Sequence, residues 1–211
     1  MFDLFDDALN KITGQKTYGD FKKALIDSNC TRCGLSEART HIVVDRGNPG
    51  AKVVMIGEAP GEHEDIQGKA FVGRAGQLLD GMLKAVGFDT NEDSLIINVV
   101  KCRPPENRAP NPKEAATCIP YLKKKLALVK PKIVLLLGAT ALKHVMPDKS
   151  DQSMKEGVGS FFTHPEYPDV QFMVLYHPAY ILRDPRKKPL MEEHLTKFKY
   201  FWDELKKSEL I

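Results

Sequence analysis

Four cysteines are the residues whose types and spacing point most directly to chemistry in this chain of 211 residues. Cys30 and Cys33 form a C-x2-C pair, and Cys102 and Cys118 follow with fifteen residues between them. A C-x2-C pair offers two thiolates to one metal, and folding can bring a second pair to complete four ligands. Zinc and an iron–sulfur cluster both accept four thiolates, and this spacing does not separate them. Two disulfides, or unrelated buried thiols, are the alternatives without a metal.

A site made of four cysteines has no open position for water or substrate, so it would be structural. Its place in the sequence would pin the N-terminal segment and the loop of residues 103–112 against the body of the protein. The chemistry of the chain is therefore expected elsewhere.

A second group of reactive side chains lies in Gly57-Glu-Ala-Pro-Gly-Glu-His-Glu-Asp65 and continues through residues 71–77. It follows the apolar run 53–56, which is typical of a buried strand, and precedes a helical pattern that begins near Arg74. Glycines and a proline allow tight turns and close approach to a ligand. A plain connection needs only a few residues, so this segment is predicted to be a binding loop.

Composition places the chain among soluble globular proteins of one domain, residues 1–211, with 42% hydrophobic and 28% charged residues. No apolar run is long enough to span a bilayer, and the acidic start is unlike a secretory signal, so a cytoplasmic protein is expected. The net charge of +3 is a weak indication of a polyanionic partner. The basic cluster 123–125 is expected on a solvated helix face, and the cluster 183–188 in a phosphate-binding loop.

Strand-like runs alternate with helical patterns along the chain. This alternation predicts an α/β fold with three layers, in which helices cover both faces of a central, mostly parallel four-stranded sheet. The expected strands are residues 53–56, 95–100, 132–137 and 170–175, with a short flanking run at 161–163; the expected helices are residues 17–29, 76–86, 113–128, 139–145 and 189–207.

Distinctive residues follow the four expected strands: Glu58, Asn98, Gly138 and His177. In open α/β sheets, ligands bind beyond the carboxyl ends of the strands. Residues far apart in the chain would therefore meet at one rim of the sheet, and the sequence predicts a single site there.

Taken together, these segments resemble the family 4 uracil-DNA glycosylases, the iron–sulfur branch of the uracil-DNA glycosylase superfamily. The resemblance covers the chain from Cys30 to about Arg183 and is carried by the order and gaps of its segments. These are Cys30-x2-Cys33, Gly57-Glu-Ala-Pro-Gly61, Phe71-Val-Gly-Arg-Ala-Gly-Gln-Leu-Leu79, Asn98-Val-Val-Lys-Cys-Arg-Pro-Pro105, Cys118 and His177-Pro-Ala179.

The resemblance implies a 4Fe–4S cluster on Cys30, Cys33, Cys102 and Cys118. It also implies an enzyme that excises uracil from single- or double-stranded DNA and leaves an abasic site without cutting the strand. A monomer is expected, and a sliding clamp is an open possibility as a partner, through a docking peptide within residues 1–18 or 208–211.

The resemblance also assigns roles around the flipped base, with Gly57 and Ala59 in the binding loop. Phe71 would stack under the uracil, although a core aromatic is the plain alternative. Asn98 would pair with N3–H and O4, which distinguishes uracil from cytosine; otherwise it would be a turn residue. Glu64 would crowd the 5-carbon against thymine, and is otherwise a solvated carboxylate.

His177 would donate to O2 of the departing uracil as negative charge develops there; a surface histidine is the alternative. After it, Tyr180, Ile181 and Leu182 would wedge into the vacated base stack, with Arg183 on a phosphate. The same apolar residues could instead begin to bury the last helix.

The chain also limits what the resemblance can assign. Family 1 enzymes carry a water-orienting aspartate where this chain has Ala59, so Glu58 is the nearest candidate for a catalytic base. Three other functions stay open: a non-catalytic uracil- or DNA-binding module, the related branch that traps uracil-DNA covalently, and an iron–sulfur electron carrier. The trapping branch uses a histidine in the loop that follows the second motif, and residues 103–112 contain none.

Overall fold

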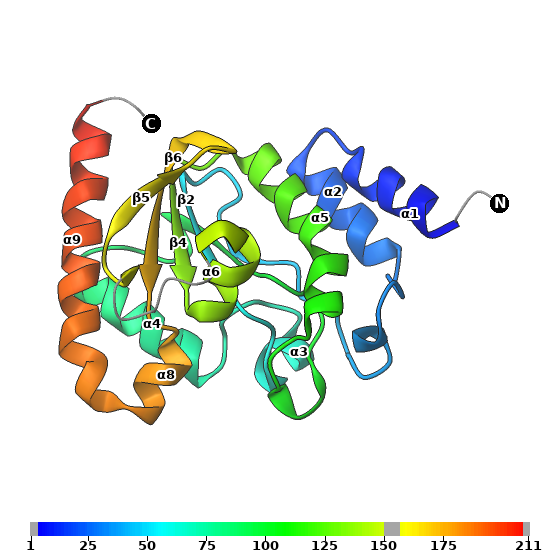
Figure 1. Ribbon diagram of the computed structural model, residues 1–211, viewed down its shortest axis with the longest axis horizontal. Helices are drawn as coiled ribbons and strands as arrows, with labels where there is room; N and C mark the ends of the chain where they lie inside the picture. Colours follow the sequence, from blue (N-terminus) through cyan, green and yellow to red (C-terminus); the bar gives the residue numbers. More distant parts are fainter. Residues whose placement is uncertain (1–3, 150–156, 209–211) are drawn as a thin grey trace.

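The structure is a computed structural model that describes residues 4–149 and 157–208 (Figure 1). Its helices are α1 (Leu4–Thr13), α2 (Tyr18–Asp27), α3 (Glu62–Gln67), α4 (Arg74–Ala85), α5 (Pro112–Val129), α6 (Ala139–Val145), α8 (Pro178–Arg183) and α9 (Lys188–Lys207). Its strands are β1 (Arg46–Gly47), β2 (Val53–Gly57), β3 (Ser94–Asn98), β4 (Ile133–Leu137), β5 (Phe161–His164) and β6 (Tyr167–Leu175).

The described strands form one sheet in the order β1-β3-β2-β4-β6-β5. The four central strands run parallel, as the sequence predicts, and the two edge strands pair antiparallel to their neighbours. The expected count of four strands is therefore wrong, because the sheet has six. The two-residue strand β1 is too short to show a periodic pattern, whereas β5, half buried at the other edge, confirms the short run expected at residues 161–163.

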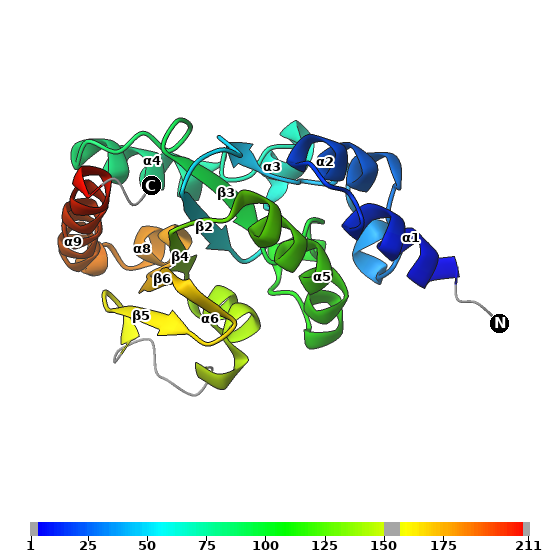
Figure 2. The ribbon, with the colours of Figure 1, turned by 90° about the horizontal axis from the view of Figure 1, so that it is seen from above.

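Strands β2, β3 and β4 are buried along their whole length, because helices cover both faces of the sheet. Alternate residues of β2 point into two separate hydrophobic clusters. One cluster packs the sheet against α2 and α5 and reaches the cysteines, and the other packs it against α4 and α9. Figures 1 and 2 show these helices on opposite sides of the sheet, which confirms the three-layer α/β/α class.

The five predicted helices are confirmed with small shifts at their ends, whereas α1, α3 and α8 were not predicted. The segment expected to be a binding loop contains α3, and the expected wedge loop is α8. Helices α3 and α8 have only six residues each, too few for apolar periodicity to appear. Of the helices that the structure describes, none has the length and apolar character that crossing a membrane requires.

Candidate active site

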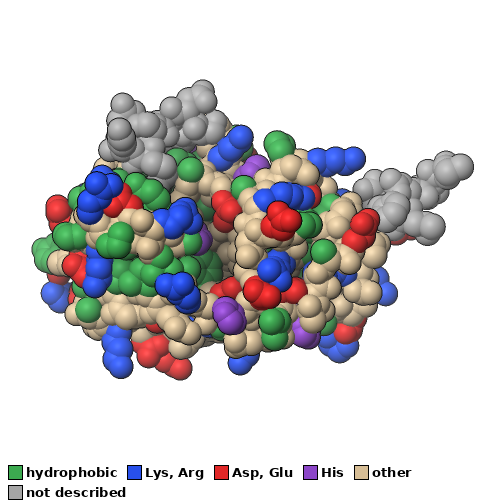
Figure 3. All heavy atoms as spheres, turned by 90° about the horizontal axis from the view of Figure 1, so that it is seen from below, with side chains coloured by type: hydrophobic (Ala, Val, Ile, Leu, Met, Phe, Trp, Pro, Cys, Tyr) green, Lys and Arg blue, Asp and Glu red, His purple; other side chains and the backbone are tan. Residues whose placement is uncertain are grey.

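A pocket of about 370 Å³ lies at the carboxyl ends of the parallel strands. Its lining comes from Glu58, Ala59, Pro60, Gly61, Glu64, Phe71, Ala75, Gly76, Asn98, Pro104, Asn107, Arg108, His177, Ala179 and Arg183. Figure 3 shows this end of the molecule, hollowed near its middle with Lys and Arg side chains on either side of the hollow. The residues predicted from separate motifs therefore meet in one cavity.

Asn98 is the last residue of β3 and lies beside Gly57, the last residue of β2, in the parallel register. Its side chain is 1% exposed, and within the described protein neither the amide oxygen nor the amide nitrogen has a hydrogen-bond partner. Buried polar atoms are nearly always hydrogen-bonded. An unpaired donor and an unpaired acceptor lining a pocket are what a ligand with the complementary pair would satisfy.

Phe71 forms one wall of the pocket from an unusual backbone position. Its φ angle is +55°, a left-handed conformation that a phenylalanine rarely adopts. A Cβ atom added to Gly57 would lie 2.5 Å from the Phe71 ring and 2.6 Å from Oδ1 of Asn98. Glycine at position 57 is thus needed for the ring and the amide to approach the end of β2 together.

His177 follows β6 and is the N-terminal cap of α8. Its ring lies 5.7 Å from the Phe71 ring, centroid to centroid. Nδ1 accepts a hydrogen bond of 3.2 Å from the backbone N–H of Ala179, so in the neutral imidazole the proton is assigned to Nε2. Burial lowers the pKa of His177, opposed by the charge of Glu58. The site therefore holds a neutral imidazole with one N–H donor.

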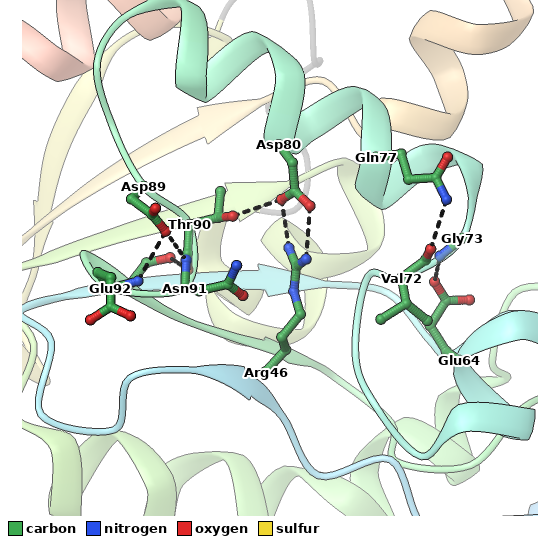
Figure 4. Close-up of polar contacts among 11 residues, drawn as sticks. Arg46, Glu64, Val72, Gly73, Gln77, Asp80, Asp89, Thr90, Asn91 and Glu92 are labelled. Atoms are coloured by element: carbon green, nitrogen blue, oxygen red, sulfur yellow. Dashed lines mark hydrogen bonds and ion pairs between the residues drawn. The ribbon is translucent and has the colours of Figure 1, made fainter.

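Glu64 fixes the segment that carries Phe71. Its carboxylate accepts hydrogen bonds from the backbone N–H groups of Gly61, at 3.1 Å, and Gly73, at 2.7 Å. Figure 4 shows the contact with Gly73, and also the paired hydrogen bonds by which Arg46 of β1 holds Asp80 of α4. Glu64 lines the pocket as predicted, and its carboxylate joins two loop segments by hydrogen bonds, so it is not a freely solvated carboxylate.

Glu58 lies at the pocket edge beside Ala59. Its carboxylate accepts a hydrogen bond from the hydroxyl of Thr140, in the first turn of α6. This contact holds the carboxylate from a neighbouring helix, and sequence motifs alone did not indicate Thr140.

The residues expected to wedge into DNA have different environments because they lie on a helix. Ile181 is 2% exposed and packs in the hydrophobic cluster with α4 and α9, which corrects its assignment as a DNA contact. Tyr180 is partly buried, with its ring 5.4 Å from that of Tyr176. Leu182 is 38% exposed, and Arg183 lines the pocket. Leu182 and Arg183 are thus the exposed members of the set, and Arg183 is the one that lines the pocket.

The loop after Cys102 closes the opposite side of the pocket with Pro104, Asn107 and Arg108. Asn107 has a φ angle of +55°, and Arg108 makes two hydrogen bonds to the buried carboxylate of Glu114 on α5. The sequence placed this loop near the cysteines but gave no sign that it lines the pocket.

The four cysteines lie on the α5 side of the sheet and are all free thiols. Cys33 interacts electrostatically with Cys30 and Cys118, and Cys102 with Cys118 and Cys33, so the set shares one neighbourhood. Within the described residues, no group of three or more His, Cys, Asp or Glu is arranged to hold a single metal ion. In a four-iron cluster each thiolate binds a different iron, so such a cluster does not require all four sulfurs to gather around one ion.

Polar donors surround these thiols. Arg39 Nη1 donates to Cys102 Sγ at 3.4 Å and to the Cys30 carbonyl at 2.6 Å, and the Tyr121 hydroxyl lies 3.5 Å from Cys30 Sγ. Burial raises the pKa of the Cys102 thiol to about 12. Metal ligation stabilises the thiolate, and a cationic donor beside the sulfur adds to this stabilisation, so the donor set fits a thiolate-ligated cluster.

Comparison with known proteins identifies the family. The Uracil DNA glycosylase superfamily matches residues 44–206. The type-4 uracil-DNA glycosylase of Sulfurisphaera tokodaii is 36% identical over 81% of this chain and 79% of its own length. The corresponding values are 37%, 81% and 85% for the type-4 enzyme of Archaeoglobus fulgidus, and 40%, 74% and 79% for that of Thermotoga maritima. The chain therefore belongs to the type-4 uracil-DNA glycosylases of the uracil-DNA glycosylase superfamily.

Proposed function

We propose that this protein is a DNA repair enzyme that hydrolyses the N-glycosidic bond of uracil in DNA and leaves an abasic site. The observation that carries the proposal is the buried, unpaired amide of Asn98, in one pocket with Phe71 and His177. Family membership supports the same activity, because the relatives are named for it.

The uracil must leave the base stack to enter this pocket. The Phe71 ring would then stack on its face. The Asn98 amide would accept from N3–H and donate to O4, and both of its unpaired atoms would be satisfied. Cytosine presents the opposite pattern, an acceptor at N3 and a donor at C4, so the same amide would leave two unmatched contacts. Glu64 would limit the space at the 5-carbon, where thymine carries a methyl group.

Bond cleavage would depend on the departing base. As the bond between C1′ and N1 breaks, its electron pair moves onto uracil and negative charge develops at O2. The Nε2–H of His177 would donate to O2 and stabilise that charge most strongly in the transition state. A water oxygen then bonds to C1′ and loses its proton to solvent or to a nearby carboxylate.

Glu58 is the carboxylate available to that water, and Thr140 holds it in place. Ala59 supplies no acid or base, so stabilisation of the leaving group would dominate the rate. The variant Glu58→Gln tests the remaining role of the carboxylate. Near-full excision in that variant would show that Glu58 is not an essential base.

We also propose that Cys30, Cys33, Cys102 and Cys118 hold a 4Fe–4S cluster. Its contribution would be structural, a cross-link between the N-terminal segment, the loop after Cys102 and helix α5. The proximity of the four free thiols and the donors around them support this assignment. Purified protein should then be brown and contain about four iron atoms per chain, whereas zinc would leave it colourless.

The chain would act as a single domain and as a monomer on uracil-containing DNA. Both hydrophobic clusters pack on one sheet, which supports one domain. We place the protein in a reducing compartment such as the cytoplasm, where cysteines are kept from forming disulfides and stay available to a cluster. A clamp-docking peptide stays a proposal: residues 1–3 and 209–211 lie outside the described part, and Leu4–Thr13 is helical.

One assay separates the proposed activity from its rivals. The protein is incubated with a single-stranded oligonucleotide that carries one uracil, and the product is treated with alkali. Strand cleavage that depends on alkali is expected, because alkali breaks the backbone at an abasic site. An intact, tightly bound oligonucleotide would instead identify a binding module, and an adduct that resists SDS would identify covalent trapping.

A further inference from the structure

We infer that Lys101 is a positioning residue for uracil recognition, which acts by holding the main chain that carries Asn98. This inference rests on the proposed function of the pocket. Lys101 does not line the pocket, and no motif used above gives it a role.

The geometry around Lys101 is specific. Its side chain is 2% exposed, and its Nζ donates to the backbone carbonyls of Asn98 and, at 2.9 Å, Val99. These carbonyls lie at the point where β3 ends, since the last register pair with β2 is Gly57 with Asn98. One ammonium group thus holds both carbonyls at the turn out of the sheet.

The position of the Asn98 side chain follows from that turn. Among the described residues the amide has no hydrogen-bond partner of its own, so nothing polar in the protein aims it. Its direction depends on the backbone and on the narrow space beside Gly57, where an added Cβ atom would lie 2.6 Å from the amide oxygen. A lysine that fixes the Asn98 carbonyl therefore fixes the amide that would read uracil.

The lysine also connects the pocket to the cysteines. Lys101 directly precedes Cys102, and its own carbonyl accepts from the N–H of Val43 at 2.8 Å. A ligand bound at Cys102 would limit the movement of this stretch of backbone. The hydrogen bond from Lys101 to the Asn98 carbonyl would then limit the movement of Asn98 as well.

Lys125 on α5 provides a matched control. It is fully buried, which corrects the solvated face expected for residues 123–125 at this position, and its Nζ donates to a backbone carbonyl, that of Val44. It does not line the pocket, and the described structure gives it no hydrogen bond to Asn98, although it acts electrostatically on Lys101. Lys125→Met and Lys101→Met each remove a buried amino group that donates to a backbone carbonyl, so the two variants share the general cost of that loss. The hydrogen bond to the Asn98 carbonyl is lost in Lys101→Met alone.

The test compares single-turnover rates of uracil excision, after iron content and thermal midpoint are measured for each variant. We expect Lys101→Met to lose on the order of 10-fold to 100-fold in rate, the scale that follows from misplacing a recognition group. Lys125→Met should stay near the wild-type rate at a similar loss in thermal midpoint. Equal losses of rate in the two variants would overturn the inference.

A double-mutant cycle decides whether Lys101 acts through Asn98. In an Asn98→Ala background, Lys101→Met should change the rate little, because the amide that it positions is gone. The same fold loss in both backgrounds would overturn the inference. If Lys101→Met loses its iron, the cycle is run with Lys101→Arg, which keeps the charge but displaces the donor, and the same two outcomes apply.

These results are distinct from a failure of the proposed function. A wild-type protein with no excision activity would refute the function itself. An active wild type with an additive cycle would refute only the role of Lys101.

Discussion

Replacement of His177 by alanine removes the Nε2–H donor from the pocket, together with the cap that Nδ1 provides to α8. Nδ1 is already occupied by the N–H of Ala179, so only Nε2–H is available to uracil O2. Loss of one such donor costs about 10²–10³ in rate, or about 2.7–4 kcal/mol. The nearby Phe71 ring helps to exclude water from this contact, so we expect a loss near the upper end of that range.

The assay is single-turnover excision from a uracil oligonucleotide, in which product release does not limit the rate. His144→Ala is the matched control, because burial also lowers the pKa of His144, and Glu58 acts on it electrostatically, yet it does not line the pocket. We expect the control to excise uracil at nearly the wild-type rate. A His177→Ala rate within about tenfold of wild type would refute the donor role, because loss of a single donor is expected to lower the rate at least about 100-fold.

The same histidine makes a prediction about pH. Burial lowers its pKa from the ordinary 6.5, with Arg183 adding to the shift and Glu58 and Glu64 opposing it. The imidazole therefore stays neutral at and above pH 6.5, and its contribution to the excision rate should be constant there. A rate that climbs tenfold per unit as pH falls would show that the imidazolium is the active donor, contrary to this account.

The lowered pKa also has a consequence for stability. The unfolded chain takes up the His177 proton at a higher pH than the folded chain does. The free energy of unfolding should then fall as pH drops from 6.5 through the lowered pKa, and it should fall less steeply in His177→Ala. Chemical denaturation across this range measures the difference. Identical slopes for wild type and variant would contradict the shift.

Three further substitutions test the pocket and the cysteines. Gly57→Ala would place a methyl group 2.5 Å from the Phe71 ring and 2.6 Å from Asn98 Oδ1, so uracil excision should be lost. Gly81→Ala is the control, because its Cβ would meet nothing within 4 Å, and it should keep the activity. Equal excision rates in the two variants would contradict the close approach at Gly57. Asn98→Asp replaces an amide donor by an acceptor and should lower uracil excision by about 10-fold to 100-fold, measured as kcat/KM, whereas an unchanged value would remove Asn98 from recognition. Cys118→Ser should lose iron and lower the thermal midpoint, and full iron content in that variant would exclude Cys118 as a ligand.

Much of this fold follows from local pattern. The four parallel strands are short apolar runs, and Pro112 and Asn111 mark the start of α5 as helix-starting residues do. The edge strand β1 and the helices α3 and α8 were harder, because elements of two to six residues carry no periodic signal. Their formation depends on tertiary contacts, such as pairing of β1 with β3.

The site was predictable where chemistry depends on residue type and strand order. Asn98, His177 and Phe71 converge because parallel strands deliver their carboxyl ends to one rim. The supporting residues were not predictable, since Thr140 and Lys101 act through contacts that only the folded chain defines. Ile181 was assigned wrongly because an apolar residue on a helix faces the core or the solvent according to the helix's rotation, which sequence alone does not fix.

A crystal structure of the protein with uracil tests the central claim most directly. The account predicts the base in the pocket between β2, β3 and β6, stacked on Phe71, with the Asn98 amide at N3 and O4 and His177 Nε2 at O2. Uracil bound elsewhere, or turned so that the Asn98 amide still has no partner, would contradict it.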